Sequence, residues 1–283
     1  MTAALPRACV MGHPVAHSRS PMIHGYWLRQ LGIAGAYDLK DLTPEAFPEF
    51  LTRIADHGYV GGNVTVPHKE AAFRLVDRRD EVAEAIGAVN TIWLEGSVLV
   101  GGNSDVHGFL AHLDESAPGW SAAGCRAVIL GAGGAARSAA YALVKRGAEV
   151  SLVNRTLQRA NDLSARFGIH VHGFGYDVLA LLLPDADLLV NCTPLGMEGM
   201  PALEADLRPL KRSAVVYDVV YVPLETPLLA QARLLSHRTV DGLGMLLHQA
   251  GYGFAKWFGA MPSVTAELRT LVENDIRAKT AKK

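Results

Sequence analysis

Short runs of apolar residues alternate with helix-like segments along most of the chain. In the first hundred residues, strand-like runs lie at 8–11, 61–66 and 91–94. Apolar residues at helical spacing predict helices at 20–30, 47–56 and 81–86. The first of these helices has Pro21 near its start and Gly32 just after its end, as helix boundaries often do. The pattern predicts an α/β domain.

A second alternating pattern follows, after a helix-like segment at 107–113. Its strand-like runs lie at 127–130, 149–153, 169–171, 188–190, 215–217 and 239–241, mostly with helical stretches between them. Strands joined by helices pair in parallel, so this half predicts a doubly wound parallel sheet. Beyond Gly242 the pattern is helical to the end. We expect these last helices to return to the first domain, so that one domain contains residues 1–105 and 243–283 and the other residues 106–242.

A glycine-rich turn joins the predicted strand at 127–130 to a predicted helix. It fits the pattern G-x-G-x-x-[G/A], in which Gly131 permits a tight turn, Gly133 lets the backbone approach a pyrophosphate, and Ala136 keeps the helix close to the strand. The next strand ends in Asn154-Arg155-Thr156. NAD-binding units usually have an acidic residue there, whereas arginine suits a 2′-phosphate. We expect a Rossmann-type unit that binds NADP. The alternative is an ordinary strand-turn-helix corner with a solvated Arg155.

The composition narrows the function classes. Of the 283 residues, 49% are hydrophobic and 19% charged, and the net charge is −1, which argues against partners such as nucleic acid or an anionic membrane. Cys9, Cys125 and Cys192 are widely spaced, as reduced cytoplasmic thiols are. We see no signal peptide, and the apolar run at 178–183 is too short to span a membrane.

Paired histidines are the only hint of a metal site. His13 and His17 are four residues apart, but Pro14 argues against a continuous helix between them. His170 and His172 share one strand face and lack an evident third ligand. We therefore expect no metal.

Polar residues lie in unusual places in the first domain. Asn63 and Thr65 point to one side of the strand at 61–66, and Val64 and Val66 to the other. A polar pair at the carboxyl end of a buried strand suggests a ligand crevice. The segments 87–91 and 101–105 also place an amide or a carboxylate beside small residues, and the segment 12–21 adds two hydroxyls just ahead of a helix start. We expect Arg19 to face solvent. Each segment alone also fits a turn or a helix cap.

Together these segments resemble the shikimate dehydrogenase family, from near residue 8 to the final helices. The resemblance is carried by His17-Ser18-Arg19-Ser20-Pro21, Asn63 to Lys69, Asn90-Thr91, Asn103-Ser104-Asp105, Gly131 to Ala136, Asn154-Arg155-Thr156, Asn191 to Met197, Tyr217 to Tyr221 and Asp241 to Gln249. Ser104 stands where the family more often has threonine. The resemblance implies a substrate domain and a Rossmann domain with the active site in the cleft between them. It also implies NADP-dependent interconversion of 3-dehydroshikimate and shikimate, a step of chorismate and aromatic amino acid biosynthesis.

The resemblance also implies a role for each matching residue. Lys69 and Asp105 would form the proton relay, and Ser18 and Ser20 would bind the substrate carboxylate, with Tyr221 nearby. Ring hydroxyls would contact Asn63, Thr65, Asn90, Asp105 and Gln249. The cofactor would contact Gly131, Ala132, Gly133, Gly134, Ala135, Asn154, Arg155, Thr156, Arg159, Thr193, Val219, Gly242 and Met245. Arg159 joins this set because it is four residues from Arg155 on a predicted helix.

Two other interpretations stay open. One is a quinate/shikimate dehydrogenase that accepts NAD, and Arg155, Thr156 and the two serines argue against it. The other is a non-catalytic protein of the same fold that binds NADP or a metabolite. Lys69 and Asp105 argue against that, because a sensor has no need of a proton relay. We expect a monomer or a homodimer with a small-molecule substrate.

Overall fold

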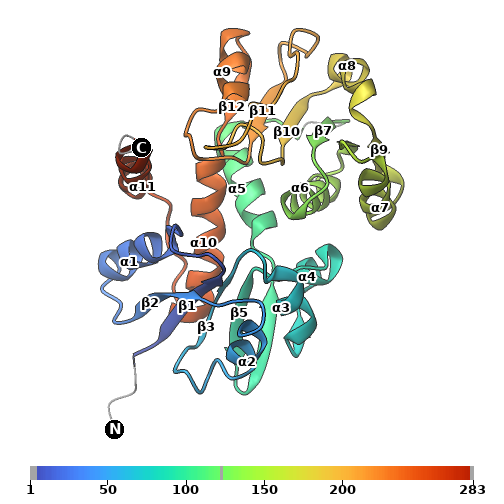
Figure 1. The fold of residues 1–283 in the computed structure, drawn as a ribbon. Helices are drawn as coiled ribbons and strands as arrows, with labels where there is room; N and C mark the ends of the chain where they lie inside the picture. The colour runs from blue at the N-terminus through green and yellow to red at the C-terminus, as the bar shows by residue number, and fades with distance from the viewer. Residues whose placement is uncertain (1–4, 122–123, 281–283) are drawn as a thin grey trace. The chain divides into compact units, whose positions relative to one another are not determined.

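The computed structural model describes residues 5–121 and 124–280. The chain divides into two compact units (Figure 1). The first contains the residues up to Asp105 together with Leu247–Val272, and the second contains Val106–Leu246 and the residues from Glu273 on. Residues 243–246 and 273–283 belong to the second unit, whereas the sequence prediction placed them in the first domain. The predicted boundaries at 105/106 and 242/243 stay predictions.

The first unit is built on a mixed six-stranded sheet with the order β2-β1-β3-β5-β6-β4. Its strands are β1 (Arg7–Gly12), β2 (Ala36–Asp41), β3 (Gly61–Val64), β4 (Arg78–Arg79), β5 (Thr91–Glu95) and β6 (Val98–Gly102). Its short helices are α1 (Ser20–Gln30), α2 (Phe47–Thr52), α3 (Lys69–Leu75) and α4 (Glu81–Ile86). Strand β1 pairs in parallel with β2 and β3, whereas β5 runs antiparallel to both β3 and β6.

Hydrophobic clusters lie against both faces of strand β1. Cys9 and Met11 belong to one cluster, and Ala8 and Val10 belong to the other. A central strand that is buried on both faces carries apolar side chains at successive positions, as β1 does. The indole of Trp257 closes the second cluster and donates to the backbone oxygen of Ile92 (2.7 Å).

Several elements of the first unit differ from the sequence prediction. The helix expected at 47–56 ends at Thr52, after which the backbone makes tight turns such as Ile54 N–H to Leu51 O. Strand β3 ends at Val64, so the expected alternation stops there and Val66 is 69% exposed. The expected pairing of Val66 with Val64 on one face is therefore wrong. Strand β2 was missed because Tyr37 is its only buried residue, a weak hydrophobic signal that is typical of an edge strand.

The second unit confirms the predicted doubly wound sheet. Six parallel strands follow the order β12-β11-β10-β7-β8-β9, and Figure 1 labels all of these strands except β8. They are β7 (Arg126–Leu130), β8 (Glu149–Val153), β9 (Val171–Phe174), β10 (Leu188–Asn191), β11 (Val215–Asp218) and β12 (Arg238–Val240). Their connections contain α6 (Gly134–Lys145), α7 (Leu157–Phe167), α8 (Leu179–Leu182) and α9 (Pro227–Leu234). Strand β9 begins at Val171, later than expected, because residues 168–170 form a 3₁₀ turn.

The register of this sheet brings several loops to one edge. Leu130 pairs with Val153 and with Asn191, and Asn191 pairs with Asp218. The residues that follow these four strand ends therefore lie along the same carboxyl edge, where open α/β sheets bind ligands.

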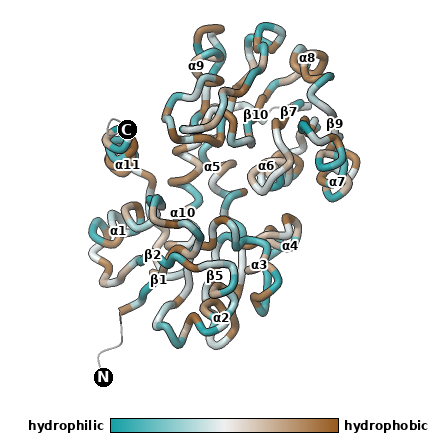
Figure 2. Tube along the Cα trace, viewed as in Figure 1, coloured by the Kyte–Doolittle hydropathy of each residue, from teal (hydrophilic) through white to brown (hydrophobic). Residues whose placement is uncertain are grey.

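Helix α7 follows strand β8 and is mostly exposed. It shows hydrophobic and polar stretches in Figure 2 and buries only Ala160 and Leu163.

Two helices end the chain, α10 (Gly242–Phe258) and α11 (Ala266–Thr280), close to the expected helical region. Helix α5 (Asp105–Ser116) precedes the second sheet. Over the described residues, no helix is both long enough and apolar enough to cross a membrane.

Candidate active site

Lys69 and Asp105 form an ion pair in the first unit. Lys69 is the first residue of α3, Asp105 is the first residue of α5, and Lys69 Nζ donates to Asp105 Oδ2 at 2.6 Å. The side chains are 30% and 17% exposed, so a small ligand can reach them. The Val89 N–H donates to Lys69 O (3.0 Å), which joins the start of α3 to the loop that contains Asn90.

Asn90 orients the carboxylate of this pair. Its Nδ2 donates to Asp105 Oδ1 at 2.8 Å, and its Oδ1 accepts from the backbone N–H of Ser104 at 2.7 Å. Asn90 is 3% exposed, so these bonds are shielded from water. The Asp105 N–H also donates to Asn103 Oδ1 (3.0 Å). Both carboxylate oxygens of Asp105 are therefore held in place, one by Asn90 and the other by Lys69.

Gln249 joins this cluster from helix α10. The hydroxyl of Ser104 donates to Gln249 Oε1 at 3.0 Å, and Gln249 is 9% exposed. The Ser104 hydroxyl also lies 3.1 Å from Thr91 Oγ1. The Ser104 hydroxyl thus connects Gln249 and Thr91 within the cluster. The structure brings together four of the predicted side chains here, Lys69, Asn90, Asp105 and Gln249.

Asn63 extends the cluster toward strand β2. Its Nδ2 lies 3.3 Å from Asn90 O and 3.3 Å from Thr91 Oγ1, and its Oδ1 accepts from the hydroxyl of Tyr37 at 2.6 Å. Sequence reasoning missed Tyr37 because β2 was not predicted. The only signal was the alternation of Tyr37 and Leu39 with Asp38 and Lys40.

Ser18 and Ser20 lie together at the start of α1. The Ser18 hydroxyl donates to Ser20 Oγ (3.2 Å) and accepts from the Ser20 N–H (3.3 Å). Arg19, between them, is 9% exposed, so the expectation that it faces solvent is wrong. Its backbone is already helical (φ −91°, ψ −2°), and consecutive helical residues do not alternate between opposite faces as strand residues do.

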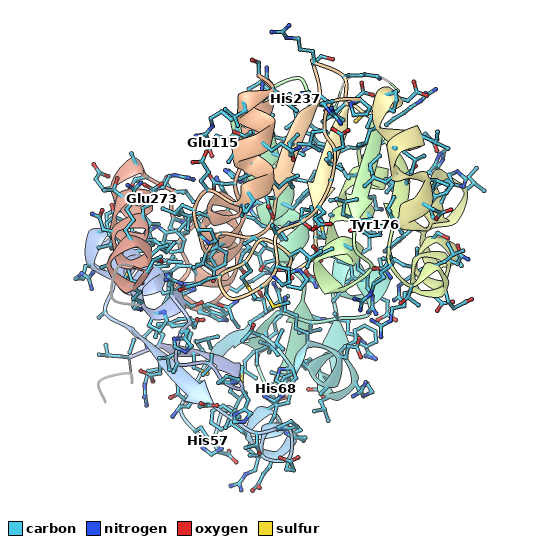
Figure 3. All side chains as sticks on the ribbon, turned by 45° about the horizontal axis from the view of Figure 1, so that its top comes forward. His57, His68, Glu115, Tyr176, His237 and Glu273 are labelled. Carbon is cyan, nitrogen blue, oxygen red and sulfur yellow. The ribbon has the colours of Figure 1, made fainter. Side chains whose placement is uncertain are left out.

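The loop from Thr65 to Lys69 is anchored by its own side chains. Thr65 is half-buried just beyond β3, and its methyl group occupies the space that a Cβ on Gly12 would need. His68, labelled in Figure 3, is 2% exposed and stacks on Phe47 at 4.2 Å between ring centroids. Its Nε2 lies 2.7 Å from Leu42 O; a carbonyl only accepts, so Nε2 carries the proton. His68 therefore holds the residue before Lys69 in place.

The glycine-rich turn of the second unit suits a pyrophosphate. Gly131 has φ +108°, which favours glycine, and helix α6 begins without a side-chain cap. A Cβ added at Gly133 or Gly134 would meet nothing within 4 Å. The first N–H groups of a helix lack partners within it and attract anions. Half-buried Ala132 and Ala135 flank these exposed glycines, and Ala136 is buried as expected.

Two arginines lie just beyond strand β8. Arg155 and Arg159 are exposed, and among the residues that the structure describes neither forms an ion pair with a carboxylate. Thr156 is the N-cap position of α7, and Asn154 Nδ2 donates to Thr156 O at 2.9 Å, which shapes the turn. Both guanidinium groups are thus available to a phosphate at this edge.

A buried carboxylate organises the next two loops of the same edge. Asp218, with no exposed surface, accepts from Asn191 Nδ2 (3.0 Å), the Val220 N–H (3.0 Å) and the Thr226 hydroxyl (2.6 Å). Burial raises the pKa of Asp218 to about 6, and these hydrogen bonds oppose the shift. Thr193 donates its N–H and its hydroxyl to Asn191 Oδ1 (3.0 and 2.7 Å), so its hydroxyl shapes the loop.

The remaining predicted contacts lie near the start of α10 or after β11. A Cβ on Gly242 would overlap with the backbone of Val219, so this close approach requires glycine. Asp241 caps the helix by accepting from the Leu243 N–H at 2.9 Å. Met245 and Tyr221 are half-buried in the second unit. Among the described residues, no three His, Cys, Asp or Glu side chains gather as a metal site would need.

A dinucleotide-binding sheet combined with a lysine–carboxylate cluster defines a dehydrogenase of the Rossmann class. Residues 10–92 match the shikimate dehydrogenase substrate binding domain, and residues 114–197 match shikimate / quinate 5-dehydrogenase. The chain belongs to the shikimate dehydrogenase family.

Similar proteins cover nearly the whole chain. The shikimate dehydrogenase (NADP(+)) of Mesorhizobium japonicum is 56% identical over 277 residues, which are 98% of this chain and 99% of the relative. The shikimate 5-dehydrogenase of Thermus thermophilus, solved with NADP(H) and shikimate, is 36% identical with a TM-score of 0.84, over 97% and 99% of the two chains. The quinate dehydrogenase of Corynebacterium glutamicum, solved with NAD, is 31% identical with a TM-score of 0.88, over 95% and 99%.

Proposed function

We propose that this chain is an NADP-dependent oxidoreductase that interconverts 3-dehydroshikimate and shikimate, a step in the synthesis of chorismate and aromatic amino acids. The observation that carries the proposal is the accessible Lys69–Asp105 pair, at 2.6 Å, within a cluster of oriented amides and hydroxyls. The shikimate dehydrogenase (NADP(+)) that is 56% identical over 98% of this chain supports it. A cytoplasmic location and a monomeric or homodimeric state stay predictions.

The chain's own part in the chemistry is to move one proton and hold the substrate. When bound, NADP would supply the hydride acceptor for oxidation of a secondary alcohol, and NADPH the hydride donor for reduction of the ketone. The Lys69 ammonium donates a proton to the carbonyl oxygen during reduction, and the neutral Lys69 amine accepts the hydroxyl proton during oxidation. Asp105 Oδ2 holds Nζ in one place, and Asn90 prevents the carboxylate from turning away.

Substrate binding is assigned to the polar groups that surround this pair. Ser18 and Ser20 provide two adjacent hydroxyls for a carboxylate, with Tyr221 as a third proposed contact. Asn63, Thr65, Asn90 and Gln249 are proposed to contact the ring hydroxyls. Such a pocket rejects an analogue that lacks a hydroxyl, because its own buried polar groups would be left unpaired.

Removing the Ser20 hydroxyl is expected to raise KM for shikimate with little change in kcat. A hydrogen bond to a charged group contributes about 1.5–3 kcal/mol, so the increase should be roughly 10- to 150-fold. Steady-state kinetics of Ser20→Ala and Ser18→Ala measure it. Ser97→Ala, an exposed serine in the β5–β6 turn, is the matched control. Unchanged KM in both variants would place the carboxylate elsewhere.

The cofactor is assigned to the carboxyl edge of the second sheet. The open turn at Gly133 and Gly134 fits the pyrophosphate, and Arg155 and Arg159 fit the 2′-phosphate that distinguishes NADP from NAD. Asn154 and Thr156 shape that turn. Thr193, Val219, Gly242 and Met245 are further proposed contacts of the cofactor.

Replacing Arg155 by alanine tests this cofactor assignment. An arginine–phosphate bond is charge-assisted, so we expect kcat/KM for NADP to fall roughly 10- to 150-fold and that for NAD to stay unchanged. Measuring both cofactors with both proteins gives the answer. Arg166→Ala, an exposed arginine near the other end of α7, is the control. Equal use of NAD and NADP by the wild type would favour the NAD-accepting quinate/shikimate alternative, which resembles the Corynebacterium glutamicum enzyme.

A further inference from the structure

A buried tyrosine outside the predicted site touches one of its central residues. Tyr37, on strand β2, is 9% exposed, and its hydroxyl donates to Asn63 Oδ1 at 2.6 Å. Strand β1 lies between β2 and β3, and the small Ala8 of β1 pairs in register with Tyr37. Tyr37 therefore contacts Asn63 across β1, from a strand that bears no other predicted site residue.

The surroundings of Asn63 determine which end of its amide faces Tyr37. On the other side, the amide lies 3.3 Å from the backbone oxygen of Asn90. A carbonyl oxygen can only accept, so the NH₂ group must face it. The amide oxygen then faces Tyr37, which must donate. Nδ2 donates to Asn90 O and to Thr91 Oγ1, both at 3.3 Å, which is long for an N–H···O bond. A ligand oxygen at a shorter distance would therefore compete for one of these two protons.

Tyr37 is itself held rigidly. Its ring stacks on the imidazole of His24, with centroids 4.0 Å apart and planes 16° from parallel. Burial raises the pKa of Tyr37 well above its usual value, and a hydrogen bond from the Ser20 side chain opposes the shift only in part. The hydroxyl therefore keeps its proton at physiological pH.

We propose that Tyr37 is a positioning residue that fixes the Asn63 amide with its NH₂ group directed to the substrate. Asn63 then offers only N–H donors, so the ring oxygen that faces it must accept. Without the Tyr37 hydroxyl, only the two long Nδ2 contacts, to Asn90 O and Thr91 Oγ1, would hold the amide in this orientation. The inference rests on the proposed function, because it assigns the role of Tyr37 through a predicted substrate contact.

Tyr37→Phe tests the inference, because phenylalanine keeps the ring and removes only the hydroxyl. The variant removes the short hydrogen bond to Asn63 Oδ1 and holds the amide less firmly, so we expect KM for shikimate to rise roughly tenfold. KM for NADP and kcat should stay near the wild-type values. Tyr59→Phe is the matched control, since the Tyr59 hydroxyl donates to Asp38 Oδ2 (2.8 Å), on the residue next to Tyr37 along β2. A simple loss of stability would lower the melting temperature without this selective change in KM.

A double-mutant cycle separates the inference from the proposed function. If Tyr37 acts through Asn63, then Tyr37→Phe should add nothing to the KM of Asn63→Ala. Asn63→Asp, which keeps an acceptor for Tyr37 and lacks N–H donors, should raise KM as Asn63→Ala does. The positioning role is overturned if Tyr37→Phe leaves KM for shikimate unchanged, or if its effect persists in full beside Asn63→Ala. Normal KM in Asn63→Ala would instead remove Asn63 from the substrate site of the proposed function.

Discussion

Lys69→Ala should lower kcat by roughly 10² to 10⁴ and still bind shikimate, because a positioned acid–base group typically contributes that factor. The reacting oxygen loses its proton partner, while the hydroxyls and amides that hold the rest of the substrate remain. Steady-state kinetics measure the turnover. Tryptophan fluorescence or calorimetry measures the binding of shikimate.

Lys40→Ala is the matched control for this experiment. Lys40 also belongs to the first unit, and its Nζ lies 5.4 Å from the ring centroid of Tyr59, away from the proposed site. The control changes the net charge equally and should keep normal turnover. If Lys69→Ala also kept near-normal turnover, Lys69 would be an ordinary surface lysine and the proton relay would be wrong.

The second large effect concerns stability and pH. His24 has no exposed surface, and among the described residues neither ring nitrogen has a hydrogen-bond partner. Burial lowers its pKa from 6.5 to about 3, and an interaction with the Asn63 side chain opposes this only in part. The folded state thus binds fewer protons at this site than the unfolded state between about pH 3 and 6.5. The stability from neutral His24 is present above pH 6.5 and is lost as the pH falls toward 3.

This loss should be visible by pH 5. At about 1.4 kcal/mol per pH unit, the wild type should lose roughly 2 kcal/mol of unfolding free energy from His24 between pH 7.5 and 5. His24→Phe, which keeps a flat ring among Trp27, Tyr37 and Phe254, should lack this contribution. Urea unfolding of both proteins at the two pH values measures it, and His24→Leu serves if the larger ring does not fit. Equal pH dependence in wild type and variant would show that His24 is not buried in its neutral form.

The second unit was predictable from sequence in most of its detail. The glycine-rich motif can be recognised locally, because Gly131, Gly133 and Ala136 lie within six residues. Each is required by the steric or electrostatic demands of the same turn. Uninterrupted apolar runs such as 127–130 and 188–190 also correspond directly to buried parallel strands.

The first unit shows where sequence reasoning stops. Edge strand β2 buries only Tyr37, so no periodic apolar pattern revealed it. The candidate residues of the cluster were found through their local motifs, but the bonds between them join positions far apart in the chain. Ser104 and Gln249, for example, are 145 residues apart, and only the fold shows that one donates to the other. The burial of Arg19 was also missed, because it depends on the tertiary packing around the start of α1 and not on the local motif.

The central claim is tested most directly by the rate of NADPH formation, followed at 340 nm, when the purified protein is given shikimate and NADP. Parallel assays replace shikimate by quinate, NADP by NAD, and the wild type by Lys69→Ala. The account predicts the highest kcat/KM for shikimate with NADP, and a lower kcat/KM when quinate replaces shikimate or NAD replaces NADP. It predicts near-complete loss of turnover in Lys69→Ala. No turnover of shikimate, or equal turnover of quinate with NAD, would contradict it.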